Sequence, residues 1–133
     1  MIEVKNLSKQ FKAPSDEKGL FGPKKKPFWA VKDLNFDIKK GSVASILGPN
    51  GCGKTTTLRM IAGMLTPSRG TAFVDSVDVR KDKQTVKSKI GYMTNNTSLY
   101  DRLSVTETIK FFAELNQISA DIYMPRAEKL FDQ

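Results

Sequence analysis

The sequence lacks any apolar run of the roughly 20 residues that a membrane-spanning helix needs, so it predicts no transmembrane segment. It has a single cysteine, Cys52, which excludes an internal disulfide and fits a reducing cytosol. Its start, MIEVKNLSKQ, contains an acidic residue and no apolar stretch, which indicates no secretory signal. It has no internal repeat either. A chain of 133 residues with 39% hydrophobic and 27% charged residues is typical of one modest globular domain.

Positive charge is concentrated in one stretch of the chain. The net charge is +8, and the segment from Lys9 to Lys32 holds seven lysines against two acidic residues, a net +5. Basic and aromatic residues are not spread over a face as in a nucleic-acid binder, so no nucleic-acid partner is expected. Residues 13–29 are interpreted as a basic insertion loop, which is either solvated or in contact with a membrane surface or an acidic partner. Four apolar residues flank its lysines: Leu20, Phe21, Phe28 and Trp29.

Apolar patterns predict several short strands. Alternation of apolar and polar residues indicates half-buried strands, whereas a uniformly apolar run indicates a strand buried on both faces, as in a parallel sheet. The alternating candidates are IEVKNL (2–7) and LNFDI (34–38), with two further short candidates at TAFV (71–74) and KIGYM (89–93). The uniformly apolar candidate is VASILG (43–48).

Helical periodicity begins after Gly53. Apolar residues then recur on one helical face until Thr66-Pro67, at Leu58, Ile61, Ala62 and Leu65. SVTE at 104–107 predicts a capping box, and the helix that it opens carries Val105, Ile109 and Phe112 on one side. Pro125 suits the first turn of a last helix, which has Leu130 and Phe131 near its end.

The stretch GPNGCGKTTT at residues 48–57 predicts a phosphate-binding loop, because Gly48, Gly53, Lys54 and Thr55 fit G-x-x-x-x-G-K-[ST] between a predicted strand and a helix. Backbone N–H groups at a helix N-terminus attract anions, and glycines let the backbone approach closely. Lys54 suits the β- and γ-phosphates and Thr55 suits magnesium. The alternative is a glycine-rich turn with a surface lysine. The candidate nucleotide-binding residues here are Gly48, Pro49, Asn50, Gly51, Cys52, Gly53, Lys54, Thr55 and Thr56.

Other phosphate-binding families fit less well. A dinucleotide-binding G-x-G-x-x-G fails because Thr56 occupies the last glycine position. A GTPase would show Asp-x-x-Gly and Asn-Lys-x-Asp after the loop, and neither follows. Cys52 is either a small, tolerated side chain or a reactive thiol that bound nucleotide would protect.

Three stretches carry a resemblance to a known family. SILGPNGCGKTTTLRMIAGMLTPSRG resembles the phosphate loop and following helix of ABC transporter ATPases, and KIGYMTNNTSLYDRLSVTETIKFF resembles their Q-loop and the start of their helical subdomain. IEVKNLSKQF and AVKDLNFDIKKG extend the resemblance to nearly all of the chain except the basic loop. TNNTSLYDRLSVTE is similar to the exporter branch of the NatA type. The resemblance implies an α/β P-loop NTPase fold of the ABC type with a mixed sheet. Residues 1–133 would form the N-terminal part of one nucleotide-binding domain, with its helical subdomain starting at 104–133.

The resemblance also implies roles for individual residues, with ATP and Mg²⁺ as cofactors. Phe11 falls where an aromatic ring stacks on adenine, although it could simply close the first strand. Asn95 falls where the family has a glutamine that contacts magnesium and the attacking water. Because asparagine is one methylene shorter, a bridging water would be needed, and Asn95 could equally be a plain loop residue. Thr55 and Asn95 are thus the candidate metal ligands.

Several groups that the family needs for hydrolysis are absent. These are a strand ending in Asp-Glu, an L-S-G-G-Q-type signature and a later histidine; the sequence has no histidine and no Ser-Gly-Gly. Asp75 follows an apolar strand, but Ser76 replaces the glutamate, so Asp75 is expected to end a strand of the family's antiparallel side sheet. The chain therefore resembles the first half of an ABC ATPase domain. By itself it is expected not to hydrolyse ATP and to be marginally stable.

The function expected from the resemblance is the ATP-binding part of an ABC ATPase that couples ATP binding and hydrolysis to solute export. Its partners would be a membrane-spanning subunit and a second ATP-binding subunit, and its location the cytoplasmic face of the cell membrane. Two alternatives stay open. One is a nucleotide-binding module without turnover, which binds ATP or pairs with a full-length ATPase. The other is a truncated product without function.

Overall fold

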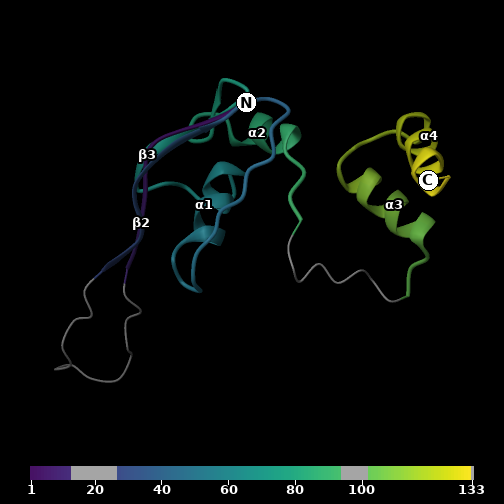
Figure 1. The fold of residues 1–133 in the computed structure, drawn as a ribbon. Helices are drawn as coiled ribbons and strands as arrows, with labels where there is room; N and C mark the ends of the chain where they lie inside the picture. The colour runs from purple at the N-terminus through teal and green to yellow at the C-terminus, as the bar shows by residue number, and fades with distance from the viewer. Residues whose placement is uncertain (13–26, 94–101, 133) are drawn as a thin grey trace. The chain divides into compact units, whose positions relative to one another are not determined.

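The structure is a computed structural model that describes residues 1–12, 27–93 and 102–132 (Figure 1). The chain divides into two compact units, Met1–Tyr92 and Met93–Gln133. No helix in these described ranges has the length and hydropathy that crossing a bilayer requires.

The first unit is built on a four-stranded sheet in the order β2-β1-β3-β4, with every neighbouring pair antiparallel. The strands are β1 (Ile2–Phe11), β2 (Phe28–Ile38), β3 (Arg69–Val74) and β4 (Val77–Asp78). Val4 on the central strand β1 pairs with Phe36 on one side and Ala72 on the other. The strands predicted at 2–7, 34–38 and 71–74 are therefore confirmed.

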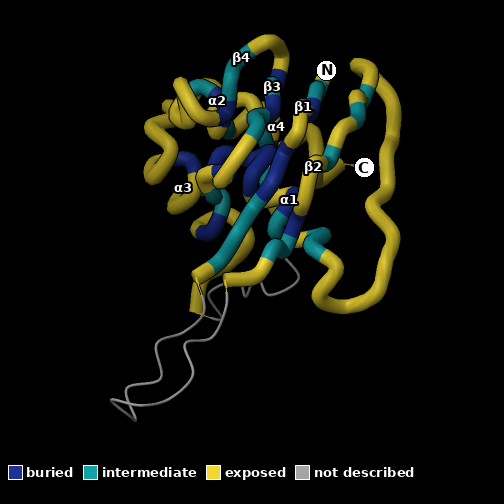
Figure 2. Tube along the Cα trace, turned by 90° about the vertical axis from the view of Figure 1, so that its left-hand side faces the viewer, coloured by how far each residue is buried: buried dark blue, intermediate teal, exposed yellow. Residues whose placement is uncertain are grey.

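The sheet and two helices share one apolar core. The helices of this unit are α1 (Lys54–Ile61) and α2 (Lys83–Lys89). Met60 of α1 and Val86 of α2 are fully buried in the same cluster as Leu7 and Ala72 of the sheet. The buried parts of the strands and of α1 are dark blue in Figure 2. This packing holds α1, and the loop that precedes it, against the sheet.

Two predicted strands are not formed. Residues 42–49 carry no strand hydrogen bonds, and Val43 and Leu47 are 98% and 88% exposed, so the prediction of a buried strand at 43–48 is wrong for this structure. Residues 90–93 are also not a strand, although Ile90 has an extended backbone. The physical reason is the same for both. A strand needs a hydrogen-bonded neighbour, and no described strand pairs with either segment.

Helix α1 ends earlier than its periodicity predicts. Gly63, at a φ of 68°, turns the chain after Ile61. Its N–H bonds to the carbonyl of Met60, and the N–H of Met64 bonds to that of Arg59. These two bonds form a Schellman motif, which closes a helix around a left-handed glycine. The helix predicted to reach Thr66-Pro67 is thus confirmed at its start and wrong at its end.

The second unit contains α3 (Val105–Leu115) and α4 (Ala120–Phe131). The predicted capping box is confirmed, with Ser104 N–H donating to Glu107 at 2.8 Å and Glu107 N–H donating to the Ser104 hydroxyl at 3.3 Å. Pro125 lies inside α4 rather than in its first turn, because the helix already begins after Ser119. The prediction of a last helix from Pro125 is therefore confirmed, but its predicted start is too late in the sequence.

The side predicted for α3 is not its buried side. Val105 and Phe112 are exposed and Ile109 is half-buried, whereas Thr108 and Ala113 are buried. The buried residues of α3 are thus small, and its larger apolar side chains are more exposed.

Candidate phosphate-binding site

The candidate loop ends where α1 begins. Gly53 is the N-cap residue, in a left-handed conformation with φ 96°, and its carbonyl accepts the N–H of Thr57 at 2.8 Å. Among the described residues, no side chain caps this end of α1 by a hydrogen bond. The N-terminus of α1 therefore presents backbone N–H groups and the positive end of the helix dipole toward residues 48–53.

Two glycines of the loop make close contacts. A Cβ on Gly53 would lie 2.4 Å from the carbonyl oxygen of Ala30 in β2, and a Cβ on Gly48 would lie 2.7 Å from the sulfur of Cys52. Both glycines also have positive φ angles, 96° and 155°. At Gly53 the loop thus packs so closely on the backbone of β2 that only a residue without a side chain fits, whereas at Gly48 it folds back on the side chain of Cys52.

The Lys54 ammonium lies within the loop. Its Nζ donates to the carbonyl oxygens of Gly48 at 2.7 Å and Pro49 at 2.8 Å, and lies 4.0 Å from the Cys52 sulfur. The chain thus brings a cation and the helix N-terminus together at one place. Such an arrangement of a cation and a helix N-terminus favours anions.

The threonines after Lys54 differ in exposure. Thr55 is exposed, Thr56 is half-buried and Thr57 is buried. Within the described ranges, no group of three or more His, Cys, Asp or Glu residues could hold a metal ion. Of the three threonines, Thr55 is the most open to solvent.

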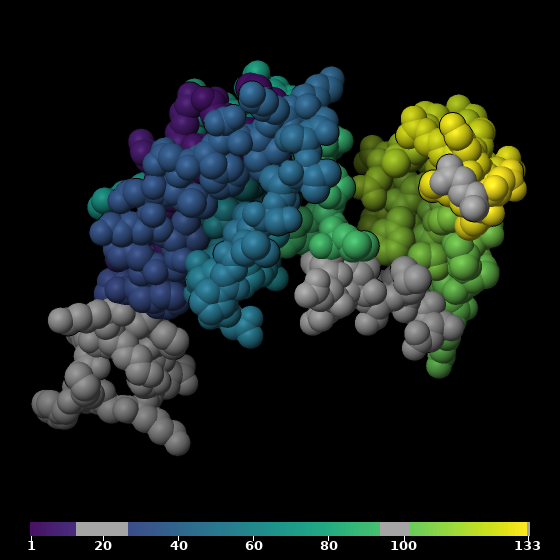
Figure 3. All heavy atoms as spheres, in the orientation of Figure 1, coloured from purple at the N-terminus to yellow at the C-terminus, as the bar shows by residue number. Residues whose placement is uncertain are grey.

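The remaining loop residues are open to solvent. Pro49, Asn50, Gly51 and Cys52 are exposed, and Cys52 is a free thiol. In the space-filling view, the segment that connects β2 to α1 reaches the surface of the first unit (Figure 3). The predicted residues from Gly48 to Thr56 therefore form an exposed loop over Gly48–Cys52 that leads through the half-buried Gly53 into the first turn of α1.

Phe11 ends β1 and stacks on another ring. It pairs across the strands with Phe28, with ring centroids 5.8 Å apart and planes at 30°, and the Lys9 ammonium lies 5.3 Å from its centroid. The geometry accommodates both predictions for Phe11, a base-stacking ring and an apolar strand end. Asn95 lies outside the described residues.

Sequence reasoning missed the first residues of β2, which follow the basic insertion loop. Phe28 and Trp29 were predicted to end the basic loop, but they begin β2, so that loop boundary was wrong. The physical reason is that two aromatic residues beside Ala30 and Val31 fit a pleated strand. This β-forming composition was the signal available in the sequence.

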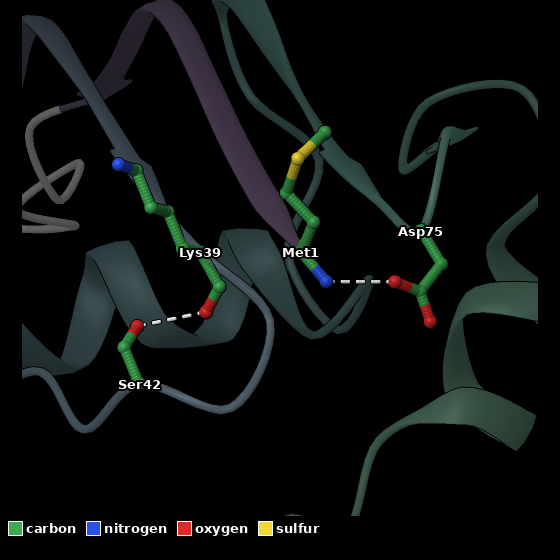
Figure 4. Close-up of polar contacts among 4 residues, drawn as sticks. All are labelled: Met1, Lys39, Ser42 and Asp75. Carbon is green, nitrogen blue, oxygen red and sulfur yellow. Dashed lines mark hydrogen bonds and ion pairs between the residues drawn. The ribbon is translucent and has the colours of Figure 1, made fainter.

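Asp75 is a turn residue. It and Ser76 have positive φ angles between β3 and β4, with Val74 paired to Val77, which is a two-residue hairpin turn. Its carboxylate accepts the Met1 amino group at 2.7 Å (Figure 4), and this bond holds the pKa of Asp75 below its ordinary value. Asp75 therefore lies at the end of an antiparallel strand, as predicted.

Ser42 begins the segment that leads to the loop. Its hydroxyl donates to the carbonyl of Lys39 at 2.7 Å, also shown in Figure 4. This bond closes the turn at Gly41 that follows β2, and the turn directs the chain back toward α1.

Comparison with known proteins identifies relatives of this chain. Residues 31–132 match the protein family described as ABC transporter. The chain is 43% identical over 111 residues to the ABC transporter ATP-binding protein NatA of Bacillus subtilis (strain 168), which covers 83% of this chain and 45% of NatA. It is 34% identical over 113 residues to the probable multidrug ABC transporter ATP-binding protein YbhF of Escherichia coli (strain K12), covering 85% of this chain and 17% of YbhF.

The fold has solved counterparts. A dimeric bacterial ABC transporter cassette, MJ0796, is similar with a TM-score of 0.74 and 26% identity, over 97% of this chain and 55% of that chain. These matches confirm the predicted fold class, an ABC-type P-loop NTPase of α/β type, whereas the sheet of the described residues is antiparallel and not the mixed sheet that was predicted. The chain spans less than half the length of the two curated relatives described above.

Proposed function

Because the chain belongs to the ABC transporter family, we propose that it binds Mg²⁺·ATP through residues 48–56 and forms the phosphate-binding part of a transporter ATPase. The observation that carries this proposal is the position of Lys54. Its ammonium lies inside a glycine loop, at the uncapped N-terminus of α1. The proposal includes residues 1–133 as the N-terminal part of one nucleotide-binding domain, with residues 104–133 starting its helical subdomain.

The loop would hold the phosphates by exchanging hydrogen-bond partners. Lys54 now donates to two loop carbonyls, and it would donate to β- and γ-phosphate oxygens instead. The N–H groups of the first turn of α1 would donate to the same anion, and the helix dipole favours its charge. The exposed Thr55 hydroxyl would join the magnesium shell. Bound magnesium neutralises phosphate charge, and the protein supplies position and donors.

Two further residues complete the proposed site. Phe11 would stack on the adenine base. Asn95 would act toward magnesium through a bridging water, because its side chain is one methylene shorter than glutamine.

The proposed whole-protein role is an ATPase that drives solute export. Two ATP-binding subunits would dimerise around bound nucleotide and act on a membrane-spanning subunit at the inner face of the cell membrane. NatA and YbhF support this proposal through their names, as ATP-binding proteins of ABC transporters. The cassette MJ0796 supports it as a dimer.

The test measures Mg²⁺·ATP binding and turnover by the protein as its cell makes it. Lys54→Ala removes charged hydrogen bonds to phosphate, so we expect ATP to bind roughly 10- to 100-fold more weakly. Lys32→Ala, which removes an exposed lysine from β2, is the matched control and should bind like the unmodified protein. Equal binding by both variants would overturn the proposal. Binding without turnover would favour the nucleotide-binding module over the ATPase.

A further inference from the structure

Strands β1 and β2 each carry an extra residue in the same part of the sheet. Between the pairs Val4–Phe36 and Leu7–Leu34, β1 has two residues opposite one residue of β2. Beyond Leu7–Leu34, β2 in turn has two residues opposite Ser8. These irregularities are two β-bulges of opposite sense, so the second restores the register that the first has shifted.

Each bulge contains a residue with a left-handed backbone, and a side chain of the other strand bonds its N–H. Asn6, at φ 49°, donates its N–H to the side-chain oxygen of Asn35 at 2.8 Å. Asp33, at φ 47°, donates its N–H to the Ser8 hydroxyl at 2.9 Å. The Ser8 hydroxyl donates to the Asp33 carboxylate at 3.2 Å and lies 3.3 Å from the Asn6 carbonyl oxygen. Side chains thus replace the ladder bonds that the bulges interrupt.

The bulges decide which side chains enter the core. Successive residues of a regular strand point to opposite faces, so residues three apart also lie on opposite faces. Val4 and Leu7 are nevertheless both buried. Val31 is buried as well, and Leu34, three residues later, packs against the same core. Loss of the bulge in β2 would shift residues 28–31 by one position and turn Val31 away from the core.

Ala30 and Val31 are also the residues on which the phosphate-binding loop packs. A Cβ on Gly53 would lie 2.4 Å from the Ala30 carbonyl oxygen and 2.9 Å from a methyl of Val31. Gly53 is the N-cap residue of α1 and directly precedes Lys54. The left-handed residue of the bulge, Asp33, follows Val31 by two positions. The bulge therefore sets the face of β2 that Gly53 meets.

We propose that Ser8 and Asp33 are positioning residues of the phosphate-binding loop. By holding the bulge in β2, they fix Ala30 and Val31 against Gly53, and the loop keeps the geometry that receives phosphates. Both residues act through the backbone of β2 and not by contact with the nucleotide. The inference rests on the proposed function, because it gives the two residues a part in nucleotide binding.

A purely structural role of Ser8 predicts a different result. Ser8 is 1% exposed, so loss of its hydroxyl leaves the Asp33 N–H without its partner and lowers the stability of the protein in either case. A less stable protein whose loop is in place binds nucleotide with the same dissociation constant, once only folded molecules are counted. A displaced loop binds nucleotide more weakly even in the folded protein. The affinity of the folded protein therefore separates the two roles.

The experiment measures the dissociation constants of Mg²⁺·ATP and Mg²⁺·tripolyphosphate for the protein as its cell makes it, at a temperature where every variant is folded. Ser8→Ala should weaken both ligands by roughly 2- to 30-fold, the range by which substitutions away from a ligand change its binding. Both ligands should weaken alike, because both are held by their phosphates. The matched control Thr71→Val removes a hydroxyl bond of 2.6 Å to Asp78 and should leave both constants unchanged, because it lies in β3 and not beside β2.

Two variants of Asp33 test the bulge itself. Asp33→Asn keeps an oxygen that accepts from the Ser8 hydroxyl, and asparagine tolerates a left-handed backbone, so both ligands should bind as to the unmodified protein. Asp33→Ala has no side-chain acceptor and disfavours that backbone, so both ligands should weaken by roughly the same 2- to 30-fold. Asp33 is exposed, so neither variant leaves a cavity in the core.

Hydrogen exchange of the protein without nucleotide gives a second readout, which does not depend on binding. The amides of Gly53–Thr57 should exchange faster in Ser8→Ala and Asp33→Ala, because the loop has lost its fixed contact with β2. They should exchange at the unmodified rate in Thr71→Val and Asp33→Asn.

The outcomes separate the two proposals. If either the affinities or the exchange of Gly53–Thr57 stay unchanged in Ser8→Ala, the inference is wrong. Equal losses in Thr71→Val would also overturn it, because any weakening of the sheet would then have the same effect. If the unmodified protein binds neither ATP nor tripolyphosphate, the proposed function fails, and the exchange of Gly53–Thr57 alone decides whether the bulge positions the loop.

Discussion

Replacing Gly53 by alanine tests the packing of the phosphate-binding loop against β2, and Gly51→Ala is its matched control. Both glycines lie in the loop with left-handed φ angles of 96° and 84°. A Cβ on Gly51 would meet nothing within 4 Å, whereas one on Gly53 would lie 2.4 Å from the Ala30 carbonyl oxygen and 2.9 Å from a methyl of Val31. The two variants thus share the backbone strain and differ in the steric overlap.

The expected magnitudes follow from these contacts. A left-handed conformation costs a residue with a Cβ about 1–2 kcal/mol, which is the whole effect expected for Gly51→Ala. Gly53→Ala adds an overlap with backbone that must shift to relieve it, which costs about 1–3 kcal/mol more. The free energy of unfolding should therefore fall by about 2–5 kcal/mol in Gly53→Ala, a large share of the 5–15 kcal/mol of an ordinary domain.

The assay is urea unfolding of both variants, together with equilibrium binding of Mg²⁺·ATP. We expect Gly53→Ala to lose more stability than Gly51→Ala, and to lose more ATP affinity because the loop moves away from β2. If the two variants were equally stable, the close contact between Gly53 and Ala30 would be refuted, and with it the position of the loop on the sheet.

Three further outcomes are expected. Alkylation of the exposed Cys52 should slow when Mg²⁺·ATP is bound, and equal labelling with and without nucleotide would contradict the placement of the phosphates beside it. Ser104→Ala should lower the free energy of unfolding of α3 by about 1 kcal/mol, measured by helicity on thermal unfolding, whereas Ser104→Asp should retain the cap. The Ser104 hydroxyl and N–H hold the pKa of the Glu107 carboxyl below its ordinary value of 4.5. The ionised Glu107 therefore stabilises α3 above pH 4.5, and this stabilisation is lost as the pH falls through the lowered pKa. An acid titration of helicity should show this loss, and Glu107→Gln should remove that pH dependence.

The glycine loop that leads into α1 could be predicted from the sequence because its requirements are local. Gly53 must turn left-handed and accept contact with β2, and Lys54 must follow it at the start of a helix. Such constraints act over a few residues, so a short pattern records them. The capping box at Ser104 and Glu107 was predictable for the same reason.

The predicted strands at 43–48 and 89–93 could not be judged from their own residues. An apolar run shows a tendency to be buried, but a strand exists only where another strand offers hydrogen bonds. No described strand pairs with residues 43–48, and Val43 and Leu47 are accordingly exposed. Pairing is a property of residues distant in sequence, which a local pattern does not contain.

The end of α1 and the start of α4 were also predicted wrongly. Gly63 carried the stop signal for α1, but the apolar period continued through Ala62 and Leu65 and outweighed it. Pro125 was assigned to a first turn because proline favours that position, although the helix already begins at Ala120, after Ser119. In α1 the single residue Gly63 outweighs the longer apolar pattern.

Hydrogen exchange of the backbone amides, with and without Mg²⁺·ATP, tests most directly whether residues 48–56 hold the phosphates of ATP. The account predicts slower exchange across Gly51–Thr57 when nucleotide is bound, and no such slowing in Lys54→Ala. Nucleotide binding that leaves these amides unchanged, or that protects a different segment instead, would contradict it.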